Sequence, residues 1–184
     1  MSDRLRIAFV VGHNNVAKGK KGFQSLPEYS FHKELASKYL NKHDVYFHDG
    51  SITSYVKRCQ DLGWRIDANG KYDLIIALHF NAYEDDDVSG AEAFHYIKSL
   101  KGRYYAKYYT NLITRNFKTR NRGPKSLFSK KQRGYRELVM SKSTTILVEP
   151  FFATNKEESD KFTIENYGQF LQDFICEINM NGKY

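Results

Sequence analysis

Residues 73–82 read DLIIALHFNA and contain the clearest strand of the sequence. The run from Leu74 to Leu78 is apolar at every position, which is typical of a strand covered by helices on both faces of a sheet. The strand ends on His79. Open α/β sheets bind their ligands outside the carboxyl ends of their strands. His79 is therefore a candidate site residue, although a histidine in such a place is about as often a hydrogen-bonded structural residue.

Two other predicted strands deliver a titratable side chain in the same way. The apolar strand at 5–11 is followed by His13, and the β-branched strand at 144–148 is followed by Glu149. Pro150 restricts Glu149 to extended geometry, so its carboxylate belongs to the end of the strand. Three strands of one sheet thus each end in a side chain that can bind a metal or move a proton.

Helical patterns separate these strands. A helix is predicted from Pro27 to Asn41, a second one capped by Ser51, and a terminal one with an apolar stripe from Ile164 to Ile178. Shorter strands are predicted at 44–48 and 91–96. Because strands alternate with helices throughout, the sequence predicts an α/β layer sandwich with a largely parallel, mixed sheet flanked by helices. We expect residues 1–184 to form a single domain, since there are no repeats and no linker.

The composition indicates a partner with negative charge. The formal net charge is +8 and the isoelectric point is about 9.3. The span 101–136 contains 12 Lys and Arg and no Asp or Glu, interleaved with aromatic residues. We expect a helix in its first part, interrupted at Arg122-Gly123-Pro124. Nucleic acid held by phosphate contacts and stacking is one possible partner. Anionic cell-wall polymers are another, and a solvated helix surface is the structural alternative.

Several features limit the setting in which the protein acts. Cys59 and Cys176 are far apart and show no metal-binding spacing, so we expect two buried free thiols. No apolar run reaches the roughly 20 residues that a membrane helix needs. Residues 1–4 lead directly to a strand without the pattern of a signal peptide. We expect a monomer made in the cytoplasm, whose route to its site of action the sequence does not identify.

The candidate site combines the three strand ends with Glu28, in the first turn of the first helix. The carboxyl ends of parallel strands share one edge of the sheet, so these side chains can converge. Two imidazoles and a carboxylate suit zinc and leave a fourth position for water, as in catalytic zinc sites. The remaining carboxylate is then a natural general base. In the structural alternative, Glu28 only complements the helix dipole.

These motifs, in this order, resemble the zinc-dependent N-acetylmuramoyl-L-alanine amidases of the amidase 3 type. The resemblance covers nearly the whole chain. It is carried by the motifs Gly12-His13, Glu28, His79-Phe80-Asn81-Ala82, Gly90-Ala91-Glu92, and Leu147-Val148-Glu149 with Asn155 and Glu158 downstream. It departs from the family after the first histidine, where Asn14-Asn15 replaces a glycine-rich step.

The resemblance implies a phosphorylase/hydrolase-like fold in which His13, Glu28 and His79 bind one zinc ion and Glu149 is catalytic. It also implies the reaction, which is hydrolysis of the amide bond between N-acetylmuramic acid and L-alanine in peptidoglycan. The same zinc site on another peptide or amide is an alternative, since function belongs to the site. His32 and Glu34 lie on the helix of Glu28 and compete with it as a ligand. His43, His48 and His95 match no motif, and we interpret them as strand or surface residues.

Overall fold

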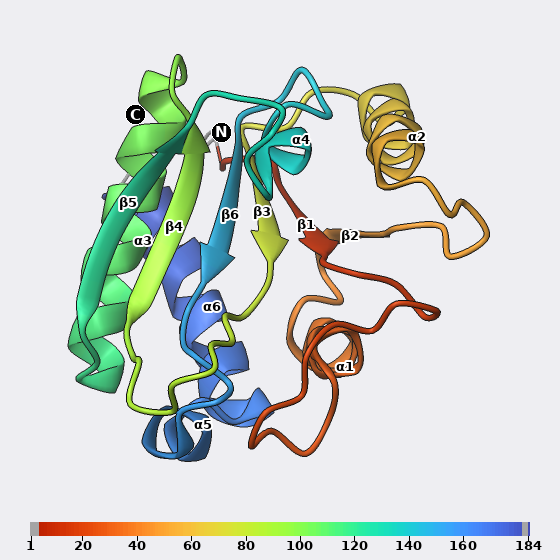
Figure 1. Cartoon of the computed structure of the whole chain (residues 1–184). Coiled ribbons are helices and arrows are strands. Elements are labelled where there is room, and N and C mark those ends of the chain that lie inside the picture. Colours follow the sequence, from red (N-terminus) through yellow and green to blue (C-terminus); the bar gives the residue numbers. More distant parts are fainter. Residues whose placement is uncertain (1–3, 182–183) are drawn as a thin grey trace.

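The computed structural model describes residues 4–181 and 184 and forms one α/β domain (Figure 1). A six-stranded sheet has the order β2-β1-β3-β6-β4-β5. Neighbouring strands are parallel except for β4 and β6, which are antiparallel. The predicted mixed, largely parallel sheet is confirmed. Residues 1–3, which are part of the basis for expecting no signal peptide, lie outside the described residues.

Strands and helices alternate along most of the chain, and the sequence predicts all the strands except the one at 121–127. The strands are β1 (Ile7–Val11), β2 (Asp44–Phe47), β3 (Leu74–Leu78), β4 (Ala91–Tyr96), β5 (Asn121–Leu127) and β6 (Thr145–Glu149). The helices are α1 (Glu28–Tyr39), α2 (Tyr55–Ala68), α3 (Leu100–Phe117), α4 (Tyr135–Leu138), α5 (Lys156–Lys161) and α6 (Ile164–Met180).

Two apolar layers hold the sheet in place, one on each face. The helices α1, α3 and α6 pack on one face, against strand residues such as Phe9 and Ile76. The helices α2 and α4 cover the other face, where Ala8 and Ile75 point. The strands β1, β3 and β6 are buried along their whole length. Their apolar runs therefore reflect burial on both sides, and they give rigid support to whatever follows them.

The predicted helix in the first part of the basic span is confirmed as α3, which ends at Phe117 and does not continue through Arg122-Gly123-Pro124. The sequence did not predict that these three residues lie inside a strand, β5. This strand has one neighbour, β4, and its other edge is open. Pro124 is tolerated there because an open edge requires no N–H donor. The register shifts by one residue between Ala91 and Glu92, and Gly123 has a φ of 75°, which together indicate a bulge.

Two further expectations need correction. The second helix is capped by Ser54, whose side chain accepts a hydrogen bond from the Lys57 N–H, and not by Ser51. Ser51 instead bonds to Asp49 in the preceding turn. Cys59 is a buried free thiol as expected, whereas Cys176 is free but exposed on α6.

No helix among the described residues is long and apolar enough to cross a membrane.

Candidate metal centre and catalytic cavity

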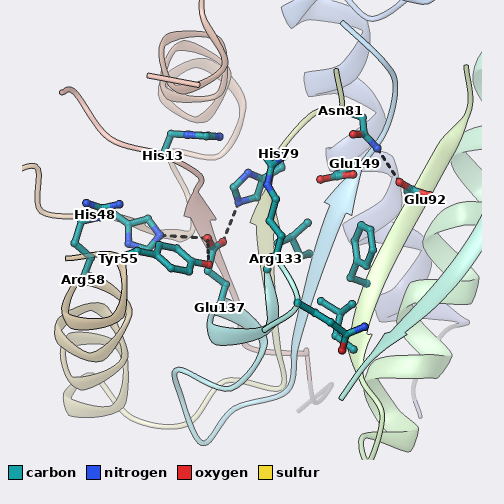
Figure 2. A pocket seen from close by; sticks show the side chains of 15 residues that line it. His13, His48, Tyr55, Arg58, His79, Asn81, Glu92, Arg133, Glu137 and Glu149 are labelled. Carbon is teal, nitrogen blue, oxygen red and sulfur yellow. Dashed lines mark hydrogen bonds and ion pairs between the residues drawn. The ribbon is translucent and has the colours of Figure 1, made fainter. Parts of the chain in front are cut away.

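The strand ends β1, β3 and β6 meet at one edge of the sheet, as the parallel arrangement requires. The ladder continues past the strands, since the Gly12 N–H donates to the Leu78 carbonyl (3.0 Å) and the His79 N–H donates to the Val148 carbonyl (3.1 Å). His13, His79 and Glu149 therefore follow three adjacent strands and face one cavity of about 630 Å³ (Figure 2).

His13, Glu28 and His79 form a compact cluster. Their ligand atoms all lie within 4.8 Å of one another. Glu28 Oε1 is 3.0 Å from His79 Nδ1, and Glu28 Oε2 is 3.0 Å from His13 Nε2. The Phe80 N–H also donates to Glu28 Oε1, at 3.1 Å. This bond fixes the carboxylate between the two imidazoles.

The donor set of this cluster fits a metal cation. His13 Nε2 is buried and makes no hydrogen bond, although it lies beside the carboxylate, so its lone pair is available. Burial alone would raise the pKa of Glu28, but the two imidazoles beside it hold that pKa well below its usual range. The carboxylate is therefore charged. Two imidazole nitrogens and one carboxylate oxygen are the ligands of open, catalytic zinc sites.

The backbone beside the cluster is adapted to it. His13 has a φ of 62°, a left-handed conformation that costs a non-glycine residue of order 1–3 kcal/mol and that occurs often at functional sites. Gly19, with a φ of 76°, lies against Glu28, and an added Cβ would be 2.6 Å from Glu28 Oε2. The glycine-rich loop at 16–27, although exposed, thus closes over one side of the cluster.

Gly12 allows the ring of His79 to occupy its place. A Cβ on Gly12 would lie 2.3 Å from His79 Cε1, too close for any real contact. We expect Gly12→Ala to lower the free energy of unfolding by roughly 1–3 kcal/mol, as overpacking of a buried site does. Denaturant titration of both proteins measures this difference. An unchanged transition midpoint would contradict the close packing of Gly12 on His79.

Glu149 lines the same cavity. It does not belong to the cluster that His13, Glu28 and His79 form. It is the last residue of β6, and Glu92 lies opposite it on β4. Burial raises the pKa of the Glu149 carboxyl to about 7, although the positive charges of His79 and Arg133 act to lower it. A carboxyl group with this pKa can accept a proton near neutral pH and release it again.

The alternative ligands on α1 lie elsewhere. Glu34 points to the surface, where Lys38 Nζ donates to it at 2.7 Å. His32 is fully buried among Phe31, Phe80 and Tyr167, and neither of its ring nitrogens has a hydrogen-bond partner. Burial lowers the pKa of His32 to about 3, so this imidazole is neutral. Of the three candidates, only Glu28 belongs to the cluster.

Sequence reasoning missed a carboxylate and an imidazole of this cavity. Glu137 on α4 lies 2.9 Å from His79 Nε2, and His48, interpreted as a strand or surface residue, is buried 3.8 Å from Glu137. The signal for Glu137 was weak: it is the first acidic residue after a long basic span. Asn81 of the His79-Phe80-Asn81-Ala82 motif also lines the cavity, and its amide donates to Glu92 Oε1 at 2.7 Å. His43 and His95 lie outside the cavity.

These observations describe an α/β domain with a candidate metal centre at the carboxyl edge of its sheet. The chain belongs to the N-acetylmuramoyl-L-alanine amidase family, whose model matches residues 7–178. It is accordingly an enzyme of the cell-wall amidase class. No curated protein sequence matches the chain.

Solved structures with the same fold come from several bacterial cell-wall systems. The catalytic domain of CD27L endolysin targeting Clostridia Difficile is 26% identical, with a TM-score of 0.71 over 94% of this chain and 97% of that one. The N-acetylmuramoyl-L-alanine amidase from Clostridium difficile 630 is 22% identical, with a TM-score of 0.68 and 95% coverage of both chains. The amidase AmiC2 of Nostoc punctiforme is 20% identical, with a TM-score of 0.69 over 98% of this chain and 100% of that one.

Proposed function

We propose that this enzyme uses one zinc ion to hydrolyse the amide bond between N-acetylmuramic acid and L-alanine in peptidoglycan. The observation that supports this most is the cluster of His13, Glu28 and His79 beside the buried Glu149, in a chain of the N-acetylmuramoyl-L-alanine amidase family. The cluster supplies three protein ligands and the cavity leaves room for water and substrate. This is the arrangement of a catalytic metal site.

In this proposal each residue has one role. His13, His79 and Glu28 would hold the zinc ion, which when bound would polarise the scissile carbonyl and lower the pKa of a water toward about 7. Glu149 accepts the proton of the attacking water and returns it to the nitrogen of the leaving alanine. The raised pKa of Glu149 suits both steps, because the same carboxyl group must gain and then lose a proton.

The remaining lining of the cavity suits an anionic, partly apolar substrate. Arg58 and Arg133 add positive charge to the lining, and Phe94, Leu127 and Leu147 add apolar surface. The stem peptide of peptidoglycan carries carboxylates that the two arginines can bind. We further propose that residues 1–184 act as a monomeric catalytic domain made in the cytoplasm, and that anionic cell-wall polymers favour its encounter with the wall through its net charge of +8.

We expect the zinc-loaded enzyme to release stem peptides with a free alanine amino group from purified peptidoglycan, and to stop doing so when a chelator removes the metal. Mass spectrometry of digests made with and without chelator identifies the bond that is cut. Re-addition of zinc should restore the products.

Other products would decide between the alternatives. Cleavage within the stem peptide would keep a zinc hydrolase but change its substrate. Glycan chains with their peptides still attached, after incubation with enzyme that contains zinc, would contradict the amidase proposal. Salt-dependent DNA binding without any metal would favour the nucleic-acid alternative.

A further inference from the structure

Glu137 lies on α4, and its side chain contacts His79 of the proposed metal site. Its Oε2 lies 2.9 Å from His79 Nε2, and its side chain is almost completely buried. The other ring nitrogen of His79, Nδ1, faces Glu28 at 3.0 Å. His79 is thus held between two buried carboxylates, one inside the cluster and one behind it. Figure 2 shows the second of these contacts, between His79 and Glu137, as a dashed line.

This geometry assigns opposite tasks to the two nitrogens of His79. A neutral imidazole carries one N–H and one lone pair. When a cation occupies the cluster, Nδ1 must direct its lone pair at the cation, so the hydrogen resides on Nε2. Glu137 Oε2 is placed to accept that hydrogen bond. A carboxylate behind a ligating histidine fixes its tautomer and ring orientation and makes its lone pair more basic.

Glu137 is itself held rigidly. The Tyr55 hydroxyl donates to Glu137 Oε1 at 3.2 Å, and His48 Nε2 lies 3.8 Å from the same oxygen. The adjacent Leu138 is buried in the core beneath the sheet, which anchors the short helix. Burial alone would raise the pKa of Glu137. The charges of His79 and His48, together with the hydrogen bonds from His79 and Tyr55, lower it instead to about 2.

We propose that Glu137 is a positioning residue for the metal centre, which acts through His79 by holding its Nε2–H and directing Nδ1 at the cation. The inference rests on the proposed zinc-dependent function, because it requires a cation at His13, Glu28 and His79. It extends the site from three ligands to the carboxylate that orients one of them, and through Tyr55 it links α2 to the metal.

The test is the zinc affinity of two variants, measured by competition with a chelating dye. We expect Glu137→Leu, which removes the acceptor, to weaken zinc binding by roughly 10–100-fold, as loss of such an outer partner does. Glu137→Gln keeps an amide oxygen that can accept the bond but lacks the charge. It should weaken binding less, by about tenfold.

A second readout separates positioning from a purely structural role. NMR of isotope-labelled histidine nitrogens reports the tautomer of His79 in the zinc-loaded protein. We expect Nε2–H in the wild type and in Glu137→Gln, and loss of this fixed tautomer in Glu137→Leu. The matched control is Glu92→Gln, which alters another buried carboxylate of the same cavity that bonds to Asn81 and Arg122 and not to a histidine. Its zinc affinity should be unchanged.

The outcomes distinguish this inference from the proposed function. Wild-type protein that binds no zinc would overturn both. Wild-type protein that binds zinc without cutting peptidoglycan would overturn the amidase proposal and leave the role of Glu137 to be decided by the affinities. Unchanged zinc affinity in both variants would overturn the positioning role. If the leucine variant does not fold, unchanged affinity in Glu137→Gln alone would do so.

Discussion

Glu149→Gln should lower the rate of peptidoglycan hydrolysis by about 10²–10⁴-fold, the range expected when a general acid–base group is lost. The amide has the shape of the carboxylate but cannot accept a proton from water. Because Glu149 lies outside the metal cluster, zinc content should stay near that of the wild type. Rates are measured on defined muropeptides, and zinc by atomic absorption after dialysis.

The matched control for this variant is Glu34→Gln. Glu34 pairs with Lys38 on the surface of α1. In the sequence analysis it was an alternative to Glu28 as a metal ligand. Its substitution should leave both rate and zinc content unchanged. A Glu149→Gln protein that kept most of its activity would show that another group takes the proton. Loss of zinc together with activity would show that Glu149 helps to hold the metal.

His79→Ala should abolish zinc binding and, with it, hydrolysis. The loss should exceed the roughly 10–100-fold that removal of an outer partner causes, because a direct ligand is missing. The variant also leaves Glu28 and Glu137 as buried carboxylates without their shared imidazole. Removal of one partner from a buried ion pair costs about 3–5 kcal/mol. We therefore expect a lower unfolding temperature even in metal-free protein.

A second ligand variant keeps this prediction decisive if His79→Ala does not fold. The His13 side chain is about 24% exposed, so His13→Ala should disturb the core less while also removing a ligand. The control is His43→Ala, since His43 contacts Phe9 far from the cavity and should not affect zinc. Zinc retained at wild-type affinity in His13→Ala and His79→Ala would contradict the proposed metal centre.

Most of the fold could be predicted because its central strands β1, β3 and β6 are buried along their whole length. β1 and β3 are apolar at every position, and this pattern is visible without any tertiary information. Strand β5 could not be predicted in this way. It lies at the edge of the sheet, is only partly buried and contains Gly123 and Pro124, so its residues read as a turn. Its pairing with β4 is what makes it a strand.

The apolar patterns alone place His13, His79 and Glu149 at the ends of three buried strands, and parallel strands bring such residues to one edge of the sheet. Which side chain of α1 joins them depends on how that helix packs. Glu28, His32 and Glu34 are close in sequence, but they lie in the cluster, in the core and at the surface respectively.

Glu137 shows the same limit most clearly. Its contact with His79 joins residues 58 positions apart through a helix of four residues, which has too few turns for any periodic pattern. Hydrophobic periodicity reports the burial of a residue's own element and says nothing about which element lies opposite. The placement of His13, His79 and Glu149 at strand ends therefore follows from local sequence, whereas the position of Glu137 behind His79 follows only from how the chain packs.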